Sequence, residues 1–129
     1  MKILVSLIAS FLLVTQITAS EAQSLTFCKS VGKEGQPAGA AREFVLVNGG
    51  VSLSILFQFG SARPASISYD IYKVEKGKEV FSSTINQQAA PAVNWLSKTI
   101  TLYEAGSYRV YVYNASDQLL AQGTFTVTP

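Results

Sequence analysis

The last quarter of the chain alternates apolar and polar side chains with the period of a β-strand. Tyr108, Val110 and Val112 form the apolar series within residues 105–114, and a second alternating run covers residues 123–127. Successive side chains of a strand point to opposite faces, so each run has one face suited to a core and one suited to solvent. Because a short polar link separates the two runs, this region predicts a β-hairpin.

The clearest single strand is residues 51–59, where five large apolar side chains alternate with mostly polar ones. A shorter apolar run, residues 44–47, precedes it, and Asn48 and Gly49 lie between the two. Asn-Gly is the pair that two-residue hairpin turns favour. We therefore expect residues 44–47 to pair with residues 51–59.

A further hairpin is predicted from residues 66–71 and 79–85, with Gly77 in the link supplying the positive φ that such a turn requires. The strand pattern stops over residues 86–97, which are therefore expected to form a connection across the domain. Trp95 in that connection is expected to fold back onto the core.

No helix-period segment of useful length follows the first 22 residues. Short strands separated by Gly, Pro and Asn predict an all-β fold, a single antiparallel β-sandwich of seven or eight strands. The series that begins Gly106-x-Tyr108 resembles the penultimate strand of immunoglobulin-like and fibronectin type III-like domains. In those domains a tyrosine near the strand start can hydrogen-bond back to the preceding corner. The resemblance implies an Ig-like fold and no particular activity, because such domains serve many functions.

The N-terminus has the parts of a secretory signal peptide: Lys2, an apolar run over residues 3–14, and small residues over 18–22. Cleavage after Ala22 would leave one domain, residues 23–129, in a secreted or periplasmic protein. The apolar run is shorter than the roughly 20 residues that span a bilayer, so no membrane span is expected after cleavage.

Net charge and cysteine content narrow the possible functions and modifications of the chain. The net charge is +2, and it stays +2 without residues 1–22 because Lys2 and Glu21 are lost together. Nucleic acid binding, which needs a strong positive field, is therefore not expected.

Cys28 is the single cysteine and has no intramolecular partner. It is either a buried thiol that packs as a small apolar side chain or half of an intermolecular disulfide. Lipidation is disfavoured by Phe27, a bulky neighbour.

The chain contains no histidine, which is the usual general base and the commonest transition-metal ligand. Its carboxylates are scattered over different predicted elements, without the spacing of a glycosidase pair or a calcium loop. We therefore predict a protein that is not an enzyme and has no catalytic residue, cofactor or bound metal.

The outer face of the terminal hairpin is the best candidate for a binding site. If Val110 and Val112 face the core, then Arg109, Tyr111 and Tyr113 project together from the opposite face. Tyr72 can join them from the neighbouring hairpin. Tyrosine and arginine are enriched in protein interfaces, although cross-strand aromatic pairs also simply stabilise a sheet.

Two functions from different classes follow. The first is a non-enzymatic exported Ig-like module that binds another protein of the cell envelope or extracellular matrix. The second is a carbohydrate-binding module in which Tyr72, Tyr111, Tyr113 or Trp95 stack on sugar rings. Asn114 begins an Asn-Ala-Ser glycosylation sequon in an expected surface turn, where turn geometry explains the asparagine equally well.

Overall fold

The computed structural model describes residues 24–59, 64–89 and 93–129, and the predicted signal peptide, residues 1–22, lies outside them. Within these ranges the chain forms strands and no helix, and hence no helix that could span a membrane. The strands are β2 (Ser24–Cys28), β3 (Ser30–Val31), β4 (Pro37–Ala38), β5 (Glu43–Val45), β6 (Val51–Gln58), β7 (Ser66–Glu75), β8 (Lys78–Gln88), β9 (Trp95–Leu102), β10 (Gly106–Asn114) and β11 (Leu119–Thr128).

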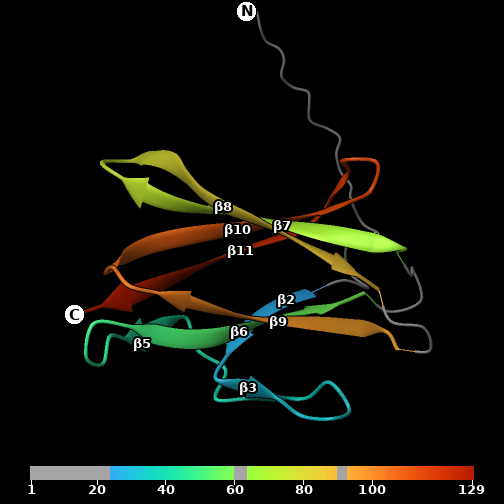
Figure 1. Ribbon diagram of the computed structural model, residues 1–129, viewed down its shortest axis with the longest axis horizontal. Coiled ribbons are helices and arrows are strands. Elements are labelled where there is room, and N and C mark those ends of the chain that lie inside the picture. Colours follow the sequence, from blue (N-terminus) through green and yellow to red (C-terminus); the bar gives the residue numbers. More distant parts are fainter. Residues whose placement is uncertain (1–23, 60–63, 90–92) are drawn as a thin grey trace, which may run out of the picture.

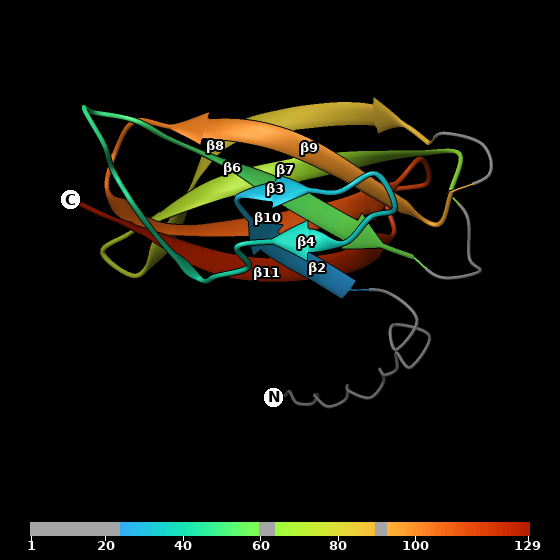
Figure 2. The same cartoon turned by 90° about the horizontal axis from the view of Figure 1, so that it is seen from below.

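Eight of these strands build two sheets that face each other. One sheet has the order β5-β11-β10-β7-β8 and the other has the order β2-β6-β9. Figures 1 and 2 show the two layers, with the small β3-β4 hairpin lying outside the three-stranded sheet. The all-β prediction is confirmed, and the arrangement is that of a β-sandwich. The pairing is antiparallel except between β11 and β5, which run parallel.

The core lies between the two sheets and contains the apolar series that the sequence identified. Five residues predicted to be in the core are buried: Tyr108, Val110, Val112, Phe125 and Val127. The Tyr108 ring stacks on Phe125 with centroids 5.2 Å apart. Its hydroxyl donates a hydrogen bond of 2.8 Å to the carbonyl oxygen of Glu104, four residues earlier. The tyrosine therefore fixes the corner between β9 and β10 while its ring fills the core.

The two hairpins expected at β7-β8 and β10-β11 are confirmed. At the β7-β8 turn, Lys76 and Gly77 have φ values of 53° and 79°. Two consecutive positive φ angles are the signature of the tight turn whose twist matches the twist of the adjoining strands.

The expected pairing of residues 44–47 with residues 51–59 is wrong. The Asn48-Gly49 turn does form, with φ values of 54° and 85°, but only a single bridge closes it. Beyond the bridge the chain changes sheet, and β5 pairs in parallel with β11 while β6 pairs with β2 and β9. Phe44 explains the difference, because it is buried against Phe125 with ring centroids 6.1 Å apart.

The expected connection over residues 86–97 is also wrong at both ends, because β8 runs to Gln88 and β9 begins at Trp95. Leu96, not Trp95, points into the core, since the two are successive strand residues. Trp95 lies on the outer face of the three-stranded sheet, where its indole packs on Gly35 of the β3-β4 loop.

The β3-β4 hairpin covers the outer face of the three-stranded sheet and buries side chains there. Cys28 and Leu56, both directed to this face, have no exposed surface. The thiol of Cys28 donates to the carbonyl oxygen of Ser54 at 3.8 Å. Burial raises the pKa of the Cys28 thiol, although nearby backbone N–H groups partly oppose the effect. The structure therefore favours the buried-thiol interpretation of this cysteine.

Candidate interaction surface

The side chains that the sequence singled out lie together on the outer face of the five-stranded sheet. Arg109, Tyr111 and Tyr113 alternate along β10 with buried valines. Tyr72 of β7 lies directly opposite Arg109 in the β7-β10 ladder. Antiparallel pairing of two central strands thus brings all four residues to one place on the sheet.

Aromatic rings on this face contact one another in a continuous series. Tyr72 and Tyr111 meet edge to face, with centroids 5.6 Å apart and planes at 83°. Tyr111 and Tyr113 are 6.5 Å apart. At the other end Tyr72 meets Phe81 of β8 at 5.7 Å and 77°. We call the four residues Tyr72, Phe81, Tyr111 and Tyr113 the aromatic face.

Phe81 was not identified from the sequence, and a β-bulge explains why. Ile85 and Ser83 lie opposite the buried Tyr69 and Ile71, so regular alternation would direct Phe81 to the core. The ladder shifts by one residue at this point, and Phe81 lies opposite Tyr72 instead. A bulge reverses the facing of every residue beyond it. Phe81 consequently leaves 57% of its surface exposed.

A polar cluster borders the aromatic face and holds two of its members in place. Glu79 of β8 accepts a hydrogen bond from the Tyr111 hydroxyl and another, of 2.7 Å, from Arg109. The bonds from Tyr111 and Arg109 lower the pKa of Glu79, and the same carboxylate raises the pKa of Tyr111. Arg109 is therefore a paired cation, and the pair is exposed enough that it orients side chains more than it stabilises the fold.

The arrangement offers contact area and hydrogen bonds. Within the part of the chain that the structure describes, no group of three or more His, Cys, Asp or Glu side chains lies close enough to hold a metal ion. Glu79 is occupied by Arg109 and Tyr111 on an open sheet surface. The outer face of the sheet carries four rings, one ion pair and the hydroxyl groups of three tyrosines.

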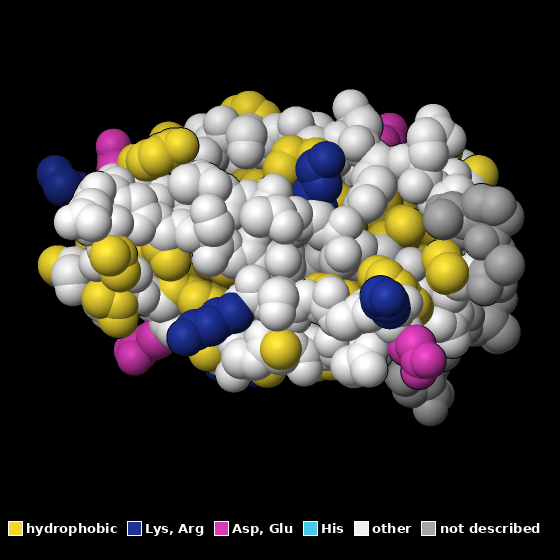
Figure 3. All heavy atoms as spheres, turned by 60° about the horizontal axis from the view of Figure 1, so that its bottom comes forward, with side chains coloured by type: hydrophobic (Ala, Val, Ile, Leu, Met, Phe, Trp, Pro, Cys, Tyr) yellow, Lys and Arg dark blue, Asp and Glu magenta, His cyan; other side chains and the backbone are white. Residues whose placement is uncertain are grey.

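Two other residues named from the sequence lie away from this face. Trp95 is on the opposite side of the sandwich, against the β3-β4 hairpin. In the view of that side, hydrophobic side chains occupy small areas separated by polar ones (Figure 3). Asn114 ends β10 at the start of the β10-β11 turn, where its side-chain oxygen accepts the N–H groups of Ser116 and Gln118, both at 2.9 Å. Turn geometry thus accounts for this asparagine.

Comparison with known proteins gives no family and only distant structural similarity. No protein-family model matches the chain, and no curated protein matches it. Among solved structures, two of superoxide reductase (neelaredoxin) from Ignicoccus hospitalis are similar, at 12% identity and TM-scores of 0.46 and 0.45, covering 87% of this chain and 86% of theirs. The alkylpurine DNA glycosylase AlkC of Pseudomonas fluorescens gives 11% identity and a TM-score of 0.36 over 82% of this chain and 31% of its own. These values concern the all-β fold alone and assign no family or activity.

Proposed function

We propose that this chain is an exported, non-enzymatic Ig-like module that binds another protein of the cell envelope or extracellular matrix through its aromatic face. The N-terminal sequence supports export, because its basic start, apolar run and small residues match a secretory signal. The proposed location is therefore outside the cytoplasm, secreted or periplasmic.

The Ig-like assignment is supported by the order of strands. With the short strands β3, β4 and β5 set aside, seven strands remain. In the seven-stranded immunoglobulin-like sandwich the first, second, fourth and fifth strands share one sheet, and the third, sixth and seventh share the other. Here β2, β6 and β9 form one sheet, while β7, β10 and β11 lie in the other together with β8. The hydrogen bond from Tyr108 to the carbonyl of Glu104 is the corner interaction that such folds place near the start of the sixth strand.

The exposure of Phe81 within the aromatic face carries the binding proposal. A cluster that only stabilised the sheet would gain most by covering its largest apolar ring, yet 57% of Phe81 faces solvent. Aromatic rings beside an arginine have the composition of interface centres, where large contact area comes at low cost in side-chain entropy. The adjoining ion pair between Arg109 and Glu79 gives the partner polar groups to match.

Carbohydrate binding has less support from the geometry. Tyr72 meets Tyr111 edge to face at 83°, and the planes of Tyr111 and Tyr113 are tilted by 32°. The three rings therefore do not form one flat platform for a sugar ring. Trp95, the largest candidate platform, is on the opposite side of the sandwich and packs on Gly35.

The experiment is affinity capture from envelope and matrix extracts with the full-length chain and two double variants. Phe81→Ser with Tyr111→Ser disrupts the aromatic face. Tyr103→Ser with Val47→Ser is the control. It removes two exposed side chains, at 73% and 66% exposure, that are not part of the aromatic face. A protein retained by the native chain and the second variant, and lost by the first, supports the proposal. Equal retention by both variants contradicts it, as does binding on a glycan array with no protein captured.

A further inference from the structure

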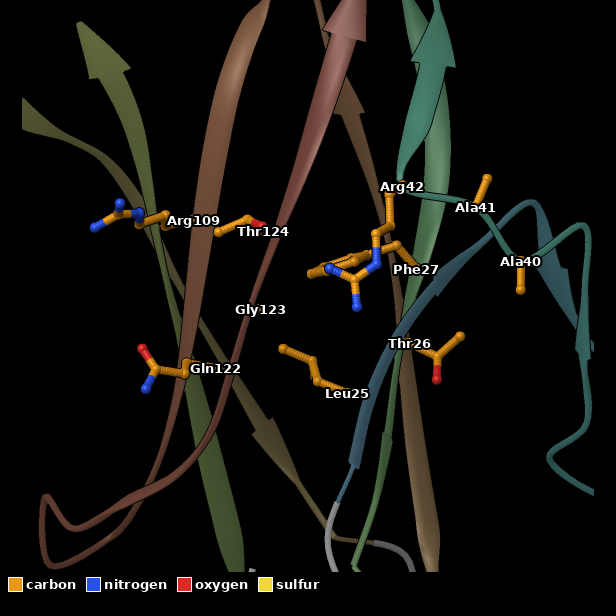
Figure 4. Close-up of a pocket in the computed structure, with 10 residues that line it drawn as sticks. All are labelled: Leu25, Thr26, Phe27, Ala40, Ala41, Arg42, Arg109, Gln122, Gly123 and Thr124. Carbon is orange, nitrogen blue, oxygen red and sulfur yellow. The ribbon is translucent and has the colours of Figure 1, made fainter. Parts of the chain in front are cut away.

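One long side of the sandwich is open between β11 and β2. A notch of about 610 Å³ lies there, bounded by Leu25 and Phe27 of β2 and by Gly123 of β11. Figure 4 shows Leu25 and Phe27 projecting into the space between the two strands. Phe27 packs directly on the main chain of Gly123, since a Cβ added to this glycine would lie 3.0 Å from the Phe27 ring. Phe27 is buried, and Leu25 is the half-buried apolar side chain that borders the notch.

The main chain of β11 beside the notch is paired on one side only. Its other edge pairs with β5 over residues 126–128, where the N–H of Thr126 donates to the carbonyl of Arg42 at 2.8 Å. Alternate residues of a strand direct their main-chain groups to the same edge, so those of Gln122 and Thr124 point the same way as those of Thr126. Among the residues that the structure describes, no strand pairs with this edge of β11 at Gln122 or Thr124, because β10 pairs with the opposite edge and β5 pairs only at residues 126–128.

The notch carries a positive charge. Arg42 precedes β5, lines the notch and lies with its guanidinium between β11 and β2 in Figure 4. None of the ion pairs formed between described residues involves Arg42. Arg109 also lines the notch, but its side chain extends away from it to Glu79.

We propose that this edge accepts an extended, acidic segment of a partner protein as an added strand. The segment pairs with Gln122 and Thr124 of β11 in line with β5, places apolar side chains over Leu25 and Phe27, and directs a carboxylate to Arg42. Exposed strand edges bind peptides in this way, with main-chain hydrogen bonds giving affinity and side-chain positions giving specificity. The molecule already fills the rest of the same edge with β5. The site is separate from the aromatic face, so it does not depend on the function proposed above.

The test uses the isotope-labelled full-length chain and two heptapeptides that alternate threonine and valine. One carries a glutamate in place of its central polar residue and the other a lysine. We expect the glutamate peptide to bind and to slow amide exchange of Gln122 and Thr124 at least tenfold, and to bind at least five times more tightly than the lysine peptide. Arg42→Glu is expected to reverse that preference.

Thr124→Pro removes an N–H that faces the notch and leaves the ladder with β10 intact, because Thr124 is not one of the residues that bond across to β10. Thr124→Pro should weaken binding of the glutamate peptide at least tenfold. Thr124→Val, which keeps the N–H, should change that binding less than twofold. Unchanged exchange at Gln122 and Thr124 would overturn the proposal, as would equal binding of both peptides. Slow exchange that depends on protein concentration without any peptide would also overturn it, since a second copy of the chain would then occupy the edge. Should Thr124→Pro fail to fold, the reversal by Arg42→Glu decides the matter alone.

Discussion

Gln87 joins the two sheets across the β8-β9 side of the sandwich, and its removal should destabilise the fold. The hydroxyl of Tyr69, whose side chain is fully buried, donates to Oε1 of Gln87 at 2.7 Å. Nε2 of Gln87 donates in turn to the carbonyl oxygen of Ser97 in β9 at 2.9 Å. One amide thus satisfies a buried donor from one sheet and a backbone acceptor from the other.

The expected cost of Gln87→Ala follows from these two bonds. Each contributes about 1 kcal/mol net, so the variant should lose about 2 kcal/mol of unfolding free energy, and more if the Tyr69 hydroxyl stays dry and unpaired. At an m-value of about 2 kcal/mol per molar, that loss lowers the urea midpoint by about 1 M. Gln88→Ala is the matched control, because Gln88 is the next residue of the strand and is exposed. A surface substitution of this kind changes the unfolding free energy by ~0.5 kcal/mol or less. The urea midpoint of Gln88→Ala should therefore stay within about 0.25 M of that of the native chain.

Fluorescence of Trp95 reports the transition, since it is the only tryptophan and packs on the β3-β4 loop. A cycle with Tyr69→Phe should give a coupling of about 1 kcal/mol between Tyr69 and Gln87, because each single variant removes the same bond. Equal midpoints for Gln87→Ala and Gln88→Ala, or a coupling near zero, would refute the role of this bridge.

Three further predictions follow from other contacts. Tyr108→Phe should lower the unfolding free energy by about 1 kcal/mol in urea titrations by removing the corner hydrogen bond, whereas Tyr103→Phe, at an exposed position, should change it little. Because the folded-state pKa of Glu79 is lowered, its contribution is present above the unfolded-state pKa and is lost as pH falls through the folded-state value. Between pH 7 and pH 3 the urea midpoint of Glu79→Gln should therefore fall less than that of the native chain, and an equal fall would contradict this. The thiol of Cys28 should react with a disulfide reagent only in denaturant, and rapid reaction of the folded chain would show that it is accessible.

The sequence predicted those parts of the fold that depend on local alternation and turn chemistry. Tyr108, Val110 and Val112 were identified as core because a period of two survives along an unbroken strand. Lys76-Gly77 formed the expected turn because tight turns are specified by the residues within them.

Pairing between distant segments was not predictable in the same way. The Asn48-Gly49 turn was recognised, but whether the strands on either side of it stay paired depends on where Phe44 finds its partner, Phe125, far along the chain. Trp95 was misplaced because a shift of one residue exchanges the faces of a strand, and the sequence did not show where β9 begins.

In the candidate site, too, features set by one strand were predictable and features set by pairing between strands were not. Arg109, Tyr111 and Tyr113 could be placed on one face from β10 alone. Phe81 could not, because the bulge that turns it outward is a property of the β7-β8 ladder. The notch between β11 and β2 likewise has no signal in the sequence, since it exists only because β5 covers just part of one strand edge.

Photo-crosslinking in living cells tests the proposed binding surface most directly. A photoreactive phenylalanine analogue at Tyr113, within the aromatic face, is compared with the same analogue at Tyr103, which is 73% exposed and lies elsewhere. We predict that position 113 captures one specific protein of the envelope or matrix, that position 103 does not, and that Phe81→Ser abolishes the capture. Equal capture from both positions, or none from position 113, would contradict the account.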